Sequence, residues 1–110
     1  MEVDVLKDLG LTDGEIRVYL ALLEIGTSTA GRIIEKSKIS PSKIYDVLNR
    51  LIGKGLVSYI FEGKTKHFRA APPKNILNYI ERKENELRQH KDEFKKIIHL
   101  LEEKQKSGKK

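Results

Sequence analysis

The chain contains no cysteine and no tryptophan, and it has one methionine among its 110 residues. The lack of cysteine excludes disulfides, zinc–thiolate sites and thiol catalysis. No apolar run approaches the roughly 18 residues that a membrane-spanning helix needs. The stretch 1–8 carries acidic residues and has no signal-peptide pattern. We therefore expect a cytoplasmic protein with no membrane partner.

Signs of catalysis are also missing. The sequence has no Gly-rich phosphate loop, no paired-carboxylate motif and no nucleophile elbow. Of the three histidines, His90 and His99 lie nine positions apart on one predicted helix, a spacing that does not bring both to one metal ion. His67 has Lys66 and Arg69 as basic neighbours. We interpret the histidines as surface residues and predict no enzyme, no catalytic residue, no metal site and no cofactor.

Charge, by contrast, is abundant and unevenly distributed. Charged residues make up 35% of the chain, and the net charge is +6. Residues 1–26 carry a net charge of −4, whereas residues 27–69 hold nine Lys or Arg against three acids. Ordinary surface charge could produce such a bias, but a basic middle third beside an acidic first third also suits a polyanionic partner.

A first helix is predicted over residues 12–26. Thr12 and Glu15 have the spacing of a capping box, and Leu11 and Ile16 that of a hydrophobic staple. Gly26 is a natural stop. Between these ends, apolar residues recur at helical spacing: Ile16, Tyr19, Leu20 and Leu23.

Two shorter helices follow. The second is expected to begin at a cap formed by Thr27 or Ser28 and to run to about Ser37. After a turn, Ser40 is predicted to cap a third helix whose first position is Pro41. The buried stripe of this third helix is Ile44, Val47, Leu48 and Leu51. Two short helices around a tight turn match a helix-turn-helix.

Residues 56–61 are rich in β-branched and aromatic side chains, and residues 66–70 return after a Gly-containing loop, which predicts a β-hairpin. We assign Tyr59 in this hairpin to the core, with its hydroxyl at the surface, and leave the role of Tyr45 open between core and a position at the margin of the third helix near DNA, which we favour. A helix-turn-helix followed at once by a hairpin is a winged helix. Pro72 and Pro73 then mark the end of this module.

A long helix is predicted from about residue 73 to residue 103, because no Gly or Pro occurs for about thirty residues after Pro73. At the helical rise it would measure about 45 Å. Charged residues, Glu84 and Lys91, interrupt its heptad seam at two places. The apolar seam positions form the predicted homodimer interface: Leu77, Ile80, Leu87, Phe94, Ile98 and Leu101. The predicted fold class is therefore mainly α with a small β-hairpin, a winged helix-turn-helix at residues 1–72 followed by a long C-terminal dimerisation helix at residues 73–110.

With its apolar stripe turned inward, the third helix presents polar residues to solvent. Lys43 can donate to guanine, Asn49 can pair with adenine, and Arg50 is placed for the DNA backbone. The predicted DNA-binding residues on this helix and just before it are Ser40, Ser42, Lys43, Tyr45, Asp46, Asn49 and Arg50. Contacts to phosphates are also predicted from Arg32, Lys36 and Lys38, while Lys64 and Lys66 of the hairpin can lie along a phosphate backbone or reach into a minor groove. A polar helix face alone is equally typical of solvent exposure, but the flanking helix and hairpin favour the binding interpretation.

Several stretches of this sequence match a known family: Leu9-Gly10-Leu11-Thr12, Tyr19-Leu20-Ala21-Leu22-Leu23, Gly26, Ile44-Tyr45-Asp46-Val47-Leu48, Leu51, Lys54-Gly55-Leu56-Val57 and Ala71-Pro72-Pro73. Through them, over about residues 6–80, the chain resembles TrmB-like archaeal transcriptional regulators; winged helices of the MarR and ArsR types share the architecture. The resemblance implies that the third helix is the recognition helix and that the hairpin is the wing. Larger TrmB-type proteins also carry a C-terminal sugar-binding domain, whereas here a single long helix is expected after the winged module, so sugar sensing is not carried over.

The sequence thus predicts a transcriptional regulator that binds a specific sequence of double-stranded DNA as a homodimer. The alternative is a winged-helix protein-interaction module in a transcription-related complex, because the same fold serves both purposes. The basic segment 27–69 favours DNA, since an interaction module needs no such bias.

Overall fold

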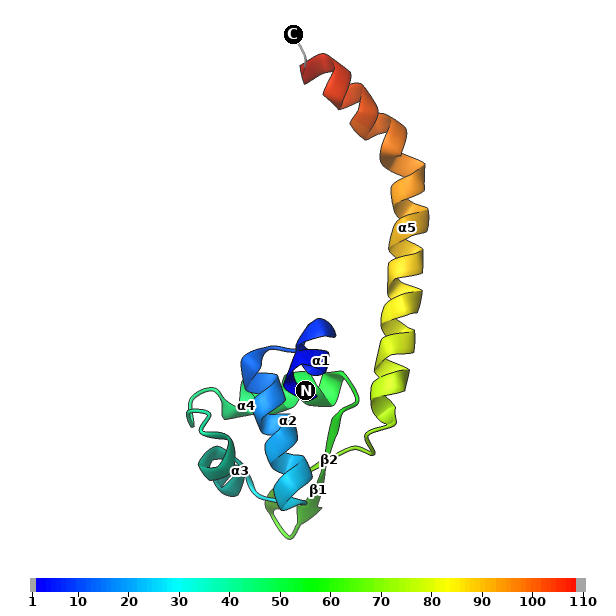
Figure 1. Cartoon of the computed structure of the whole chain (residues 1–110). Coiled ribbons are helices and arrows are strands. Elements are labelled where there is room, and N and C mark those ends of the chain that lie inside the picture. Colours follow the sequence, from blue (N-terminus) through cyan, green and yellow to red (C-terminus); the bar gives the residue numbers. More distant parts are fainter. Residues whose placement is uncertain (1, 109–110) are drawn as a thin grey trace. The chain divides into compact units, whose positions relative to one another are not determined.

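The computed structural model describes residues 2–108, which form six segments of regular structure up to Ala70 and a long final helix that begins at Asn75 (Figure 1). The predicted winged helix is confirmed, because a helix-turn-helix is followed directly by an antiparallel hairpin. The chain divides into two compact units, Met1–Tyr79 and Ile80–Lys110. The elements in order are α1 (Glu2–Asp8), α2 (Asp13–Ile25), α3 (Ala30–Ser37), α4 (Ile44–Gly53), β1 (Val57–Glu62), β2 (Thr65–Ala70) and α5 (Asn75–Gly108).

Helix α2 begins and ends as its sequence predicts. The Thr12 hydroxyl accepts a hydrogen bond from the Glu15 amide at 3.1 Å, and the Glu15 carboxylate accepts one from the Thr12 amide at 2.8 Å. This reciprocal pair satisfies two amides that a helix start leaves without partners. At the other end Gly26 adopts a φ of 77°, and its amide donates to the Leu22 carbonyl. Local chemistry therefore fixes both ends of α2.

Helix α3 starts later than expected, at Ala30, with Thr29 at the capping position. Neither Thr27 nor Ser28 is its cap. Ser28 instead pairs with the hairpin. Its backbone exchanges two hydrogen bonds with Phe68, and its hydroxyl donates to the Gly26 carbonyl. A long-range strand contact has overridden the local capping preference of a serine.

Helix α4 also begins later than predicted. Residues 41–43 form a turn, and regular helix starts at Ile44. The Ser40 carbonyl accepts from both the Lys43 and the Ile44 amides, while the Ser40 hydroxyl lies 3.2 Å from the Ser42 hydroxyl and caps no amide. The turn leads directly into the helix, so the predicted inward stripe is retained: Ile44, Val47, Leu48 and Leu51 are all buried.

Helix α1 has no counterpart among the elements expected from the sequence. Its one buried apolar side chain is Leu6, whereas Val3 and Val5 are exposed. The Leu6 carbonyl accepts hydrogen bonds from the Leu9 and Leu11 amides, which folds the chain back toward α2. A helix of seven residues with one buried apolar side chain has almost no helical periodicity in its sequence, which is why the sequence does not predict it.

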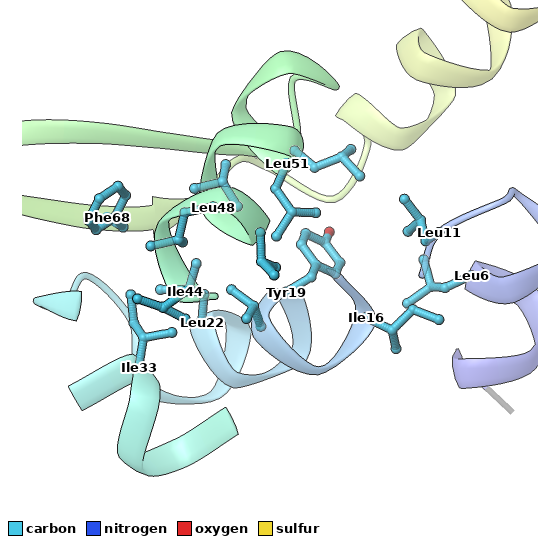
Figure 2. Close-up of a cluster of buried hydrophobic side chains, with 14 of the residues drawn as sticks. Leu6, Leu11, Ile16, Tyr19, Leu22, Ile33, Ile44, Leu48, Leu51 and Phe68 are labelled. Atoms are coloured by element: carbon cyan, nitrogen blue, oxygen red, sulfur yellow. The ribbon is translucent and has the colours of Figure 1, made fainter. Parts of the chain in front are cut away.

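The hydrophobic core of the first unit lies between α2, α4 and the hairpin (Figure 2). Tyr19 and Leu22 come from α2, Leu48 from α4 and Phe68 from β2, and all four are buried. The Tyr19 hydroxyl has no hydrogen-bond partner among the described residues, and burial raises its pKa. Tyr79 from α5 joins the same cluster, so the first compact unit extends through the start of α5, beyond the boundary expected at residue 72.

The hairpin is tight and carries one face toward the core. Glu62 pairs with Thr65, so the loop has only Gly63 and Lys64. Gly63 has a φ of 62°, a conformation that favours glycine and suits two-residue hairpin loops. The core-facing side of the hairpin carries Val57, Tyr59, Phe61, Lys66, Phe68 and Ala70, as the alternation of strand side chains and the pairing register require.

Helix α5 has 34 residues, about 51 Å at the helical rise. Of its predicted seam residues Ile80 is half-buried, and the others are exposed: Leu77, Leu87, Phe94, Ile98 and Leu101. Ile97 and Leu100 are exposed as well. Among the described residues, none of the helices combines the length and the apolar character required to traverse a bilayer.

Candidate nucleic-acid interface

The outward side of α4 and its preceding turn is polar and exposed. Ser40, Ser42 and Lys43 lie in or beside the turn, and Asp46 and Asn49 follow on the helix. Within residues 2–108, no side-chain hydrogen bond or ion pair engages Lys43 or Asn49. A helix with donors and acceptors that make no internal bond can offer them to base edges.

Arg50, near the end of α4, belongs to a charge network inside the domain. Its guanidinium Nε lies 3.7 Å from the carboxylate of Glu15, and the ammonium of Lys54 donates to the same carboxylate. Glu15 is fully buried, at 0% exposure. Burial alone would raise its pKa, but the hydrogen bonds from Lys54 and the Thr12 amide and the Lys54 charge together hold the pKa of Glu15 below its ordinary value. This buried carboxylate ties α2 to the end of the predicted recognition helix.

The basic residues predicted on and after α3 differ in availability. Arg32 is exposed. Lys36 is engaged with Glu24 of α2 through a 2.8 Å ion pair, so any phosphate contact from it would compete with this carboxylate. Lys38 is exposed and has a φ of 63°, the left-handed conformation that turns the chain between α3 and α4. The turn is further held by the Ser37 hydroxyl, which accepts from the Ile39 amide at 3.3 Å.

The two wing lysines occupy different environments. Lys64 sits in the loop and is exposed. Lys66 is half-buried, and its ammonium lies 4.1 Å from the ring centroid of Tyr59 and 5.9 Å from that of Phe61. A cation over aromatic rings is attracted by their π faces, so this ammonium is held in place.

An aromatic row, which we define as Tyr45, Phe68, Tyr59 and Phe61, links α4 to the wing. Ring centroids are 6.4 Å apart for Tyr45 and Phe68, 6.1 Å for Tyr59 and Phe68, and 5.8 Å for Tyr59 and Phe61. Phe68 is buried, but Tyr45, Tyr59 and Phe61 are 56%, 41% and 62% exposed. The assignment of Tyr59 to the core is therefore wrong. Phe61 was missed altogether, although alternation from buried Val57 puts both rings on one face.

Comparisons with known proteins agree with this fold. The family model described as "Sugar-specific transcriptional regulator TrmB" matches residues 6–74. The chain is 33% identical over 101 residues to the uncharacterized protein YrhO of Bacillus subtilis (strain 168), covering 92% of this chain and 35% of that protein. It is 37% identical over 75 residues to the HTH-type sugar sensing transcriptional regulator TrmBL1 of Pyrococcus furiosus, covering 68% of this chain and 22% of that protein. The chain thus spans a minor part of the length of these curated relatives.

Solved structures of DNA-binding and regulatory proteins have the same fold. TrmBL2, an archaeal chromatin protein whose structure is described as showing a novel mode of DNA binding, matches with a TM-score of 0.64 and 28% identity, covering 90% of this chain and 40% of that one. A MarR family protein from Bacillus stearothermophilus matches with a TM-score of 0.57 and 20% identity over 97% of this chain and 81% of that one, a likeness of fold alone.

The segment matched by the family model contains the helix-turn-helix, the wing and the stretches through which the sequence resembles TrmB-like regulators. The family consists of transcriptional regulators, which confirms the prediction that the chain is not an enzyme. This chain belongs to the TrmB family of transcriptional regulators.

Proposed function

We propose that this chain binds a specific sequence of double-stranded DNA as a homodimer and thereby regulates transcription, in the cytoplasm. The observation that carries the proposal is the exposed face of α4 and its preceding turn, on which Lys43 and Asn49 have no internal side-chain partner within residues 2–108. The start of such a helix can enter the major groove, where these residue types read base edges.

The charge distribution supports duplex DNA over a protein partner. Residues 27–69, which contain α3, α4 and the hairpin, hold nine Lys or Arg against three acids. Phosphate contacts from such a segment would position α4 without reading sequence. An interaction module of the same fold has no need for this concentration of positive charge.

Selection of genomic fragments by the purified chain tests the proposal. We expect the bound fragments from the source genome to share one short sequence, because direct contacts from α4 discriminate between base pairs. Enrichment of unrelated fragments would remove sequence specificity from the proposal. Failure to retain any fragment would favour the interaction module instead.

The same selection, repeated with Lys43→Ala and Lys64→Ala, separates base contacts from phosphate contacts. Loss of Lys43 should relax the preference at one position of the site by about 1–3 kcal/mol, because a base-edge donor is removed. Loss of Lys64, which sits in the wing loop, should weaken all fragments alike. If both variants lose affinity equally on every sequence, Lys43 is one more backbone contact.

The apolar stripe of α5 supports the homodimer. Leu87 and Phe94 are 70% and 49% exposed, one heptad apart on the same helix. A row of exposed apolar side chains along one helix is typical of an interaction site. Pairing with a second copy would cover it, and a twofold dimer would match a palindromic site with half-sites about one DNA turn apart. Glu84 and Lys91 lie at seam positions and could pair in an antiparallel crossing.

Charge substitutions on α5 test the dimer. Leu87→Glu and Phe94→Glu each place a charge in the seam twice per dimer, and we expect each to raise the dimer dissociation constant about a hundredfold. Gln89→Glu makes the same change of charge on the other side of α5 and should leave the constant within a few-fold. Sedimentation equilibrium measures all three. A wild-type chain that is monomeric at concentrations on the order of tens of micromolar would reject the homodimer.

A further inference from the structure

The wing leaves two aromatic rings in solvent on the side of the hairpin that faces α4. Tyr59 and Phe61 alternate with buried Val57 along β1, so all three side chains share the core-facing side. The helical core covers Val57 and Phe68, while Tyr59 and Phe61 extend beyond it toward the loop, at 41% and 62% exposure. Large apolar side chains that stay exposed next to a hairpin loop contribute little to folding, and two of them side by side form a surface suited to contact with a partner.

These rings are combined with an oriented cation. Tyr59 and Phe61 meet edge to face at 88° between planes, and the Lys66 ammonium lies 4.1 Å above the Tyr59 ring. Lys66 is the cross-strand partner of Phe61, so the cation and the outer ring sit side by side at the end of the wing. The exposed loop residue Lys64 adds a second positive charge beyond them.

A DNA strand has a matching pattern. The adjacent major and minor grooves are separated by one sugar–phosphate strand, so a domain with α4 in one groove and its wing at the next has that strand between them. Along the strand, anionic phosphates alternate with deoxyribose rings, whose C–H edges are apolar. The aromatic row runs from Tyr45 on α4 to Phe61 on the wing and offers rings and a fixed ammonium in the same space.

We propose that Phe61 and Tyr59 pack on deoxyribose rings of the strand that passes between α4 and the wing, while Lys66 binds the adjacent phosphate. This inference rests on the proposed function and adds to it an apolar contact with the sugar. Duplex DNA is favoured as the occupant because the rings are continuous with α4 through Tyr45 and Phe68 and are accompanied by two lysines. The wing then binds by shape and apolar contact as well as by charge.

Hydroxyl-radical footprinting on a selected fragment tests this contact, because these radicals attack deoxyribose directly. The wild-type chain should protect sugars that flank the bases read by α4. Phe61→Ala should lose that flanking protection and bind about tenfold more weakly, while protection around the α4 site remains at saturating protein. Ile60→Ala, an apolar truncation on the opposite face of the same strand, should keep the flanking protection and bind within about twofold of wild type.

Phe61→Lys separates apolar contact from charge. If the wing acted through charge alone, an added lysine would tighten binding and extend protection; the sugar contact predicts weaker binding and loss of the flanking protection. Flanking protection that survives both Phe61 variants overturns the inference and leaves the proposed function intact. A wild-type chain that protects no fragment overturns both and would direct attention to a protein as the partner of these rings. Because Phe61 is largely exposed, each variant should fold like wild type. Thermal unfolding, monitored by circular dichroism, is the control for this.

Discussion

Replacing Glu15 with Gln should lower the free energy of unfolding by about 2–3 kcal/mol. Removing one partner of a buried ion pair costs roughly 3–5 kcal/mol, because the other charge is left uncompensated. Glu15 is fully buried, but the side chain of its partner Lys54 is 23% exposed and can reach water. The expected cost therefore lies at or just below the low end of that range. A glutamine oxygen can still accept from the Thr12 amide, so the substitution preserves that part of the helix cap and isolates the charge.

The matched control is Glu24→Gln on the same helix. Glu24 pairs with Lys36 at 2.8 Å, but both side chains are largely exposed, and exposed pairs contribute about 0–1 kcal/mol. Urea unfolding of the two variants and of wild type measures the difference. Equal losses from Glu15→Gln and Glu24→Gln would show that burial of Glu15 has no energetic consequence and that α4 is held by apolar packing alone.

The contribution of Glu15 to the free energy of unfolding should also depend on pH. The pKa of Glu15 in the folded chain lies below its ordinary value of 4.5. The unfolded chain therefore takes up this proton first as the pH falls. The stability that Glu15 contributes is complete above about pH 4.5 and is lost as the pH falls through the folded pKa. Wild type and Glu15→Gln should accordingly converge in stability in acid.

The elements that could be predicted from sequence are those whose causes are local. The cap of α2 depends on Thr12 and Glu15, three positions apart, and the inward stripe of α4 on helical spacing. The elements that were missed or shifted depend on distant partners. Ser28 reads as a helix cap until its backbone pairs with Phe68, 40 positions along the chain. Helix α1 needs the core to hold Leu6, because short helices are marginal on their own.

In the candidate site, too, some features follow from local sequence and others depend on distant partners. Residue types on the outer side of α4 follow from the inward stripe, so Lys43, Asp46 and Asn49 could be assigned from sequence. The engagement of Lys54 with Glu15 joins residues 39 positions apart, and no local pattern reveals it. The position of Lys66 over Tyr59 depends on the register of the hairpin, which the two-residue loop sets and which the sequence alone leaves open.

Affinity for duplex DNA should fall on the order of a thousandfold or more between about 50 and 200 mM salt, if the proposed binding neutralises about 6–10 phosphates. Residues 27–69 hold nine Lys or Arg, of which Lys36, Arg50 and Lys54 are paired with carboxylates inside the domain. Six remain per chain, and a dimer doubles that number, so the required phosphate contacts are within reach. Each contact releases condensed counterions, which makes the dependence on salt steep.

The salt dependence of the dissociation constant, measured by fluorescence anisotropy on a selected fragment, is the decisive test of DNA binding by α4 and the wing. We expect a straight line of log affinity against log salt, with a slope of about −5 to −9. We also expect that Lys64→Ala makes this slope shallower by about one per protomer in contact, while Gln89→Glu on α5 leaves it unchanged. Affinity that is independent of salt, or a slope that Lys64→Ala does not alter, would contradict docking of the basic wing and α4 on the DNA backbone.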